Sequence, residues 1–222
     1  MNKQADIVWH FFGVENSIAA SVMTRTGDSR VEKYYQRELN VHDLESFVDS
    51  LNFESDCQHY VLYSMGLLSE KRAYQQNFRE WSHSVGINGI LPMMLLERLN
   101  ASNITFRFCY ISSESASKGS FDGVYAFSKS GMETIIRETR LTDTESAVIA
   151  VAPSMIGDAG MTTRRKDQGN VNANREMHPK GRHLNASEVA DICLFWFFNA
   201  SHYLTNEVIA INGGKFARAM HQ

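Results

Sequence analysis

Short apolar runs alternate with longer amphipathic segments along most of the chain. The apolar runs have the length of strands and are rich in β-branched and aromatic residues, at residues 6–12, 59–63, 104–111 and 147–152. The longer segments carry apolar residues at helical spacing, at residues 43–51, 76–99 and 125–140. Pro92 should bend or break the second of these helices. Strands that alternate with helices predict a parallel α/β sheet with helices on its faces.

The pattern continues through the whole chain, so we expect a single domain over residues 1–222. No internal repeat, low-complexity tract or linker interrupts it, and 222 residues suit one α/β domain. Residues 157–182 follow neither period, because they are mostly polar and rich in glycine and asparagine. We expect an irregular segment there.

A tyrosine and a lysine stand four positions apart near the start of the segment 125–140. Residues four apart share a helix face, so we expect the Lys129 ammonium to lie beside the Tyr125 phenol and to lower the pKa of Tyr125. Ser112 follows the run 104–111 and could orient a carbonyl or hydroxyl group against the tyrosine. Together these residues predict proton transfer at a carbon that bears oxygen.

The context of this pair matters more than its spacing. Tyrosine and lysine are common residues, so a pair four apart arises by chance. Here Ser112 follows a predicted strand, and the helix that begins near Tyr125 leads to another strand at 147–152. Parallel sheets bind ligands at the carboxyl ends of their strands, and these polar residues fall at such an end.

Several separate segments resemble the short-chain dehydrogenase/reductase family, in the family's order and almost from end to end. Ser112, Tyr125 and Lys129 match its catalytic serine, tyrosine and lysine, and Asn88 matches the asparagine that completes its tetrad. Further segments are similar to its Pro-Gly segment, its last helix and its last strand, at residues 151–156, 188–191 and 204–214. The resemblance implies a Rossmann-like, doubly wound parallel sheet with these four residues as its catalytic group.

The resemblance also divides the chain into two halves. Residues 1–75 correspond to a degenerate nucleotide-binding half, and residues 76–222 to the half that carries catalysis and oligomerisation. The stretch from about 157 to 182 resembles the family's mobile lid over the substrate. By the same resemblance, a nicotinamide cofactor would contact Gly13, Ser17, Ile18, Ala19, Gly66, Lys129, Pro153 and Ile156.

The nucleotide-binding half departs from the family in two ways. Where the family carries Gly-x-x-x-Gly-x-Gly, residues 13–19 retain only Gly13, although Ser17 and Ala19 are small and Ser-Ile-Ala is similar to the related enoyl reductases. The stretch from Ala19 to Asn40 is also too short for strand, helix and strand, because a parallel crossover needs at least about ten residues. About one βα unit should therefore be missing near residues 20–40.

Two assignments of the remaining strand stay open. In the first, residues 34–39 form the family's third strand and the second strand is absent. In the other, residues 31–38 form the second strand and the third is absent. Glu38 would then lie where an acidic side chain accepts a hydrogen bond from the adenosine ribose.

Two further substitutions concern the cofactor site. Tyr63-Ser64-Met65-Gly66 stands in place of the family's Asn-Asn-Ala-Gly. Asp158 replaces a threonine near the nicotinamide and the diphosphate, where a carboxylate would be repelled unless a cation intervenes. Arg164, Arg165 and Lys166 follow closely in the sequence and could supply that cation, or could simply be a solvated part of the lid.

Composition excludes several classes of partner. A net charge of −3 gives no electrostatic reason to expect nucleic acid or an anionic membrane. The longest apolar runs are too short to span a membrane, and the amino terminus lacks a signal-peptide pattern. The three scattered cysteines fit buried thiols in a reducing compartment, and no histidine shows metal-ligand spacing. We expect a cytoplasmic protein without a metal.

These observations leave three functional hypotheses. The first, which we favour, is an oxidoreductase that interconverts a carbonyl and an alcohol on a small molecule with NAD or NADP, with Tyr125 moving the proton. The second uses the same residues without a nucleotide, as a dehydratase, isomerase or condensing enzyme. The third is a catalytically silent binding subunit. By the family resemblance, helices 76–99 and 125–140 would pair with another copy in a homodimer or homotetramer.

Overall fold

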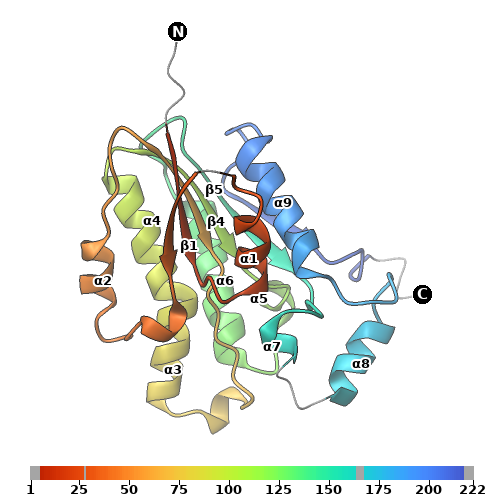
Figure 1. Cartoon of the computed structure of the whole chain (residues 1–222). Coiled ribbons are helices and arrows are strands. Elements are labelled where there is room, and N and C mark those ends of the chain that lie inside the picture. Colours follow the sequence, from red (N-terminus) through yellow and green to blue (C-terminus); the bar gives the residue numbers. More distant parts are fainter. Residues whose placement is uncertain (1–5, 28, 164–167, 218–222) are drawn as a thin grey trace.

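A computed structural model describes residues 6–27, 29–163 and 168–217 of the chain (Figure 1). Six strands form one sheet in the order β2-β1-β3-β4-β5-β6, and every neighbouring pair is parallel. The strands are β1 Ile7–Phe12, β2 Arg30–Tyr34, β3 Gln58–Tyr63, β4 Thr105–Ile111, β5 Ala147–Pro153 and β6 Glu207–Ile211. The predicted single-domain, Rossmann-like α/β fold is confirmed.

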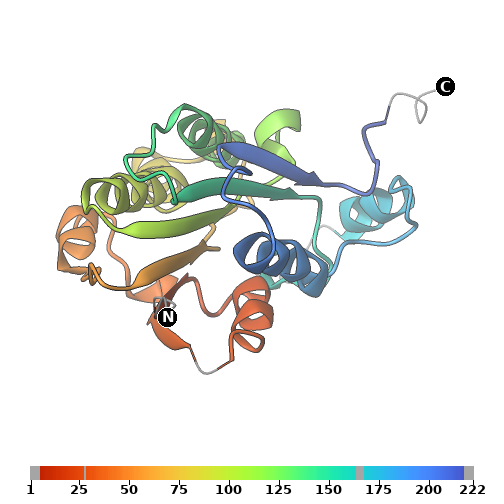
Figure 2. The same ribbon diagram turned by 90° about the horizontal axis from the view of Figure 1, so that it is seen from above.

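Helices cover both faces of the sheet, as the view from above shows (Figure 2). On one face, α1 (Ser17–Met23) and α9 (Ala186–Phe198) lie side by side. On the other face lie α2 (Leu44–Ser50), α4 (Leu91–Ala101) and α6 (Gly123–Glu138). This doubly wound arrangement buries the sheet on both sides.

The first strand, β1, is apolar at nearly every position because both of its faces are covered. Trp9 and Phe11 are buried in the core beneath α1 and α9, whereas Phe12 is buried in the core beneath α2, α4 and α6. Successive strand residues point to opposite faces, so a strand that is covered on both sides needs apolar residues at nearly every position. His10 is the polar exception in β1 and is also buried.

The edge beyond β2 shows which βα unit is missing. In the Rossmann order 3-2-1-4-5-6, the second strand lies beside the first and the third lies outside it. Here β2 pairs directly with β1, and no strand beyond it occurs among the described residues. The second strand is therefore present, as in the second of the two assignments. It ends at Tyr34, and Glu38 is exposed in the short helix η1 (Gln36–Glu38).

The predicted helix 76–99 is divided into three pieces, which are α3 (Phe78–Val85), the π-helical turn η3 (Gly86–Ile90) and α4. A short 3₁₀ turn, η2 (Ala73–Gln75), precedes them. Pro92 lies in the first turn of α4, where its missing N–H leaves the preceding carbonyls free to widen the turn. The expected break near Pro92 therefore takes the form of a π turn.

The segment 157–182 is more regular than its composition suggests. It contains α7 (Gly160–Thr163) and α8 (Gln168–Glu176), and no helix was expected there. The basic run Arg164, Arg165 and Lys166 lies outside the described residues. Within the part of the chain that the structure describes, every helix is too short or too polar to cross a lipid bilayer.

Candidate active site

The predicted site residues gather at the carboxyl edge of the sheet. The ends of the central strands are level, because Phe12 pairs with Tyr63, Tyr63 with Tyr110, and Ile111 with Val151. A short helix, α5 (Ser115–Lys118), follows β4 and leads to α6, which carries Tyr125 and Lys129. Parallel sheets bind ligands at this edge.

Asp122 fixes the start of α6 and was not identified from the sequence. Its buried carboxylate accepts hydrogen bonds from the backbone N–H of Val124 (3.1 Å) and Tyr125 (3.2 Å) as the N-cap of the helix. It also accepts from Ser69 N (2.8 Å) and from Gln76 Nε2 (2.9 Å). Asp122 thus joins the segment after β3 to the first turn of α6. The sequence feature that could have identified this cap is an aspartate three residues before Tyr125.

Tyr125 is almost completely buried, with 7% of its surface exposed. Burial raises the pKa of its phenol to about 12, because the phenolate would lose its hydration. The Ser113 hydroxyl beside the phenol lowers this pKa, and the nearby Asp122 carboxylate raises it. The expectation that Lys129 lowers the pKa of Tyr125 is wrong for this structure. Tyr125 is therefore a protonated phenol at neutral pH.

Lys129 points to the end of β4 rather than to the phenol oxygen. Its ammonium donates to the carbonyl oxygen of Ile111 at 2.8 Å and lies 4.4 Å from the centroid of the Tyr110 ring. The Tyr125 ring is further away, at 5.7 Å from the nitrogen. Burial lowers the pKa of Lys129 to about 7, while the Glu133 carboxylate raises it. Lys129 consequently titrates in the physiological range.

The two serines at the end of β4 have different partners. Ser112 is buried and donates to Oε1 of Glu133 at 2.6 Å. Ser113, the next residue, supplies the hydroxyl that meets the Tyr125 phenol. Adjacent residues at a strand end point in opposite directions, so a shift of one position changes the partner completely. The structure therefore brings Ser113, and not the predicted Ser112, to the tyrosine.

Asn88 lies in the π turn η3 and is fully buried. Its side chain accepts from Leu67 N (2.9 Å) and donates to Leu67 O (2.8 Å) and to Ser84 Oγ (3.1 Å). Its backbone carbonyl accepts from the Tyr110 hydroxyl at 2.6 Å. Because the Tyr110 ring also lies against Lys129, this tyrosine connects Asn88 to the lysine.

The residues predicted to hold the phosphates lie at the turn after β1. Gly13 has a φ of +89°, and a Cβ atom at this position would lie 3.0 Å from the backbone nitrogen of Met65, so only glycine fits. Asn16 caps α1 by accepting from Ile18 N, and Ser17 and Ala19 occupy its first turn. The Ser17 hydroxyl is buried without a hydrogen-bond partner among the described residues.

The remaining cofactor candidates lie along the same edge. Pro153 ends β5, and Ile156 forms an isolated parallel bridge with Leu184. Ser154, between them, has a second buried hydroxyl without a partner in the described part of the chain. A buried hydroxyl that lacks a partner is costly unless a ligand oxygen satisfies it. The two orphaned hydroxyls and Gly13 therefore fit a phosphate-containing cofactor at this edge.

Two further contacts involve residues that the sequence analysis assigned to the cofactor site or to its surroundings. Gly66 N donates to the side-chain oxygen of Gln36 at 3.1 Å, so Gln36 bridges the segment after β2 to the segment after β3. Asp158 is exposed, and its carboxylate accepts from Ala186 N at the start of α9, at 2.8 Å. Asp158 is thus held at a helix terminus, where partial positive charge favours a carboxylate.

Sequence comparison identifies the family to which this site belongs. Residues 39–215, most of the chain, match the family model described as "Enoyl-(Acyl carrier protein) reductase". The chain belongs to the short-chain dehydrogenase/reductase family. It is therefore an oxidoreductase by family, as predicted. The match begins at residue 39, so the turn at Gly13 lies outside it. No curated protein matches the chain.

Solved structures of short-chain dehydrogenases share the fold at low sequence identity. A short-chain dehydrogenase/reductase (glucose/ribitol dehydrogenase) from Brucella melitensis is 18% identical, with a TM-score of 0.79 over 96% of this chain and 97% of that chain. A short-chain dehydrogenase family protein from Francisella tularensis is 15% identical, with a TM-score of 0.81 over 96% of this chain and 100% of that chain. A variant of actinorhodin polyketide ketoreductase with NADPH is 16% identical, with a TM-score of 0.77 over 97% and 99% of the two chains.

Proposed function

We propose that this enzyme interconverts a carbonyl and an alcohol on a small molecule with a nicotinamide cofactor, and that Tyr125 is the proton donor and acceptor. The observation that carries the proposal is the buried Tyr125 phenol, which is protonated at neutral pH and lies beside the Ser113 hydroxyl. A protonated phenol can donate to a carbonyl oxygen directly. The free enzyme therefore holds Tyr125 in the protonated form that carbonyl reduction requires.

Each residue has a separate part in this mechanism. The nicotinamide, when bound, supplies or accepts the hydride. Tyr125 gives its proton to the substrate oxygen, and Ser113 donates a hydrogen bond that orients the same oxygen. The charged form of Lys129, which is held at the Ile111 carbonyl, would hold the nicotinamide ribose. Asn88, through its carbonyl bond to Tyr110, keeps the Tyr110 ring against Lys129.

The cofactor would be held along the carboxyl edge of the sheet. Gly13 and the first turn of α1, with Ser17, Ile18 and Ala19, would receive the diphosphate, and the orphaned Ser17 hydroxyl supports this placement. Pro153 and Ile156 would line the nicotinamide end, and Gly66 the adenosine end. The ketoreductase with NADPH that shares this fold supports a nicotinamide, either NAD or NADP.

The substitution Tyr125→Phe tests the role of the phenol. Removing one hydroxyl should lower turnover by at least about 100-fold while the fold is retained, because the ring still fills its buried site. The assay follows nicotinamide absorbance against a panel of ketones, aldehydes and alcohols, with circular dichroism of both proteins. Phe127→Tyr, on the exposed side of the same helix, is the matched control and should keep full activity. Unchanged turnover in Tyr125→Phe would rule out this mechanism.

A second candidate is a cofactor-free dehydratase, isomerase or condensing enzyme on the same acid–base residues. The Gln36 bridge to Gly66 and the absence of a strand beyond β2 among the described residues favour it, because both reduce the space for adenosine. The two candidates differ in one requirement. Only the oxidoreductase needs a nicotinamide for turnover.

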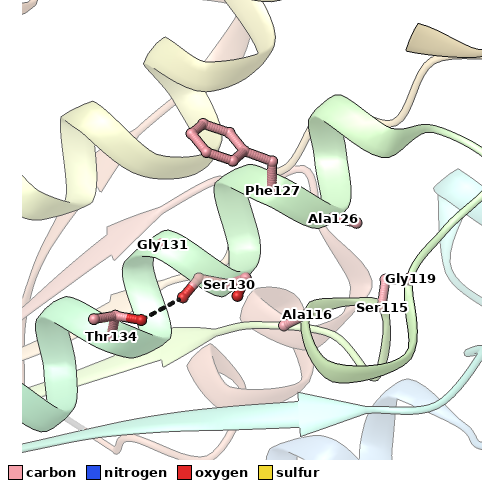
Figure 3. Close-up of a pocket in the computed structure, with 8 residues that line it drawn as sticks. All are labelled: Ser115, Ala116, Gly119, Ala126, Phe127, Ser130, Gly131 and Thr134. Atoms are coloured by element: carbon pink, nitrogen blue, oxygen red, sulfur yellow. Dashed lines mark hydrogen bonds between the residues drawn. The ribbon is translucent and has the colours of Figure 1, made fainter.

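We also propose that two copies associate through the outer face of α3 and α6. Exposed aromatic side chains gather there, and Phe78 is 80% and Phe127 is 69% exposed. Beside Phe127, small residues of α5 and α6 line a shallow cavity, which Figure 3 shows; they are Ser115, Ala116, Gly119, Ala126, Ser130, Gly131 and Thr134. Light scattering coupled to size exclusion should give a homodimer or homotetramer for the native chain, and Phe127→Glu should reduce its mass.

A further inference from the structure

A second buried charge lies beside the proposed catalytic group, on the turn of α6 that follows Lys129. Glu133 is only 5% exposed, although carboxylates are rarely buried without a partner. It stands four residues after Lys129, so the two side chains share one face of the helix. The proton-transfer mechanism uses Lys129 and leaves Glu133 without a role.

Lys129 and Glu133 hold consecutive residues at the end of β4. The Lys129 ammonium donates to the carbonyl of Ile111 at 2.8 Å, and the Glu133 carboxylate accepts from the Ser112 hydroxyl at 2.6 Å. The next residue, Ser113, is the one that meets the Tyr125 phenol. Two successive turns of α6 therefore fix the backbone that presents Ser113 to Tyr125.

We propose that Glu133 is a positioning residue, which supplies the counter-charge that keeps Lys129 protonated and, through Ser112, holds the end of β4 against α6. A buried ammonium without a nearby anion would lose its proton to water. Calling Lys129 catalytic rests on the function proposed above. The electrostatic partnership of Glu133 and Lys129 can be measured whether or not that function is correct.

Two tyrosine rings lie near the Lys129 ammonium, and one arginine lies near the Glu133 carboxylate. Tyr110 from β4 and Tyr125 from α6 face the Lys129 ammonium with their rings, and burial raises the pKa of both phenols, so both are neutral near pH 7. Arg137 lies 3.6 Å from the second oxygen of Glu133, but its side chain is half exposed and is therefore screened by water. Glu133 is thus the buried carboxylate on the Lys129 face of α6 within the described residues, and it raises the pKa of Lys129 against the effect of burial.

The test is a side-chain NMR titration of the native chain with ¹³C-labelled lysine, in which Lys129→Met assigns the Lys129 signal. Glu133→Gln keeps an oxygen that can accept from Ser112 but removes the charge, so the pKa of Lys129 should fall by roughly one unit. Ser112→Ala is the matched control, because it removes the hydrogen bond and keeps the carboxylate, and its shift should be much smaller. An equal Lys129 pKa in the native chain and in Glu133→Gln would overturn the proposal.

A second measurement covers the case in which Glu133→Gln does not fold. The ¹³C signal of the Glu133 carboxyl group in the native chain should change as Lys129 loses its proton near pH 7, because the proposal couples the two charges. A Glu133 signal that does not change as Lys129 titrates would overturn the proposal. Absence of nicotinamide-dependent turnover would instead count against the proposed function and would leave both titrations valid.

Discussion

The end of β4 shows how one position along a strand changes the chemistry of a residue. Ser112 and Ser113 are identical side chains, yet the first is paired with a buried carboxylate and the second with the Tyr125 phenol. The Ser112 hydroxyl is bound to a buried carboxylate, whereas the Ser113 hydroxyl lies beside the phenol that we propose gives its proton to the substrate. We therefore assign the orientation of the substrate to Ser113 and a positioning role to Ser112.

Alanine substitution separates the two serines. Ser113→Ala should lower kcat by about 100-fold, because it removes a donor to the reacting oxygen. Ser112→Ala should change kcat by less than about tenfold and should instead lower the free energy of unfolding by roughly 1–3 kcal/mol, because Glu133 loses its buried donor. Steady-state kinetics and urea unfolding of both variants measure the two effects. A larger loss of kcat in Ser112→Ala than in Ser113→Ala would mean that Ser112 is the serine that orients the substrate.

Residue chemistry at this site was only partly predictable. The spacing of Tyr125 and Lys129 located both side chains on one helix, but the sequence could not show that burial dominates the pKa of each group. Nor could it show that the Lys129 ammonium turns to the Ile111 carbonyl. Those outcomes depend on side chains from β4, which tertiary packing brings to α6.

At the scale of elements, Asp122 connects the start of α6 to the segment after β3. Four donors converge on its buried carboxylate, from Ser69, Gln76, Val124 and Tyr125. An N-cap that is exposed and has one such bond costs about 1 kcal/mol when it is lost. Loss of a buried cap that also accepts from two more distant donors should lower the free energy of unfolding considerably more.

Asp122→Ala should therefore lower the free energy of unfolding by about 2–4 kcal/mol. Asn77→Ala is the matched control, because Asn77 caps α3 from an exposed position by a bond to Glu80 N and should cost only about 1 kcal/mol. Chemical unfolding of the two variants gives both values. Equal losses would mean that the bonds from Ser69 and Gln76 contribute nothing to stability.

The sequence predicted most elements of the fold, because apolar periodicity defined the strands and long helices. It missed α8, whose residues Gln168–Glu176 are too polar to show a helical stripe. It also extended β2 too far, since residues 35–38 contain no glycine or proline to mark the end of the strand, yet the chain turns into η1 there. The π turn at Asn88 could not be predicted, because Pro92 indicates a break without specifying its geometry.

At the scale of the whole molecule, a buried relay of side chains joins three strands and makes stability depend on pH. The Tyr34 hydroxyl contacts Nδ1 of His10 at 3.3 Å, His10 Nε2 contacts His59 Nδ1 at 2.9 Å, and His59 Nε2 contacts the Glu54 carbonyl at 2.9 Å. A carbonyl can only accept, so His59 donates to Glu54, His10 donates to His59, and Tyr34 donates to His10. The relay requires both imidazoles to be neutral.

Acid should therefore weaken the fold. Burial, with the nearby His59 and Arg30, lowers the pKa of His10 from 6.5 to about 3, and burial also lowers that of His59. Between pH 6.5 and 3, His10 is protonated in the unfolded chain and neutral in the folded chain. The contribution of His10 to the free energy of unfolding is therefore complete above pH 6.5 and is lost as the pH falls through this range. The loss is about 1.4 kcal/mol per pH unit for one such group. In His10→Phe, the free energy of unfolding should fall less steeply between pH 6.5 and 4.5, and slopes equal to those of the native chain would contradict this account.

The central claim concerns the whole molecule, because the proposed nicotinamide site depends on a nucleotide-binding half whose described residues form no outer βα unit. The most direct test is isothermal titration calorimetry of the native chain with NADH, NADPH and their oxidised forms. We predict micromolar binding of at least one of the four, since Gly13 and the orphaned Ser17 hydroxyl remain at the phosphate turn. Absence of binding at millimolar nucleotide would contradict the hydride-transfer mechanism and would leave acid–base catalysis without a cofactor.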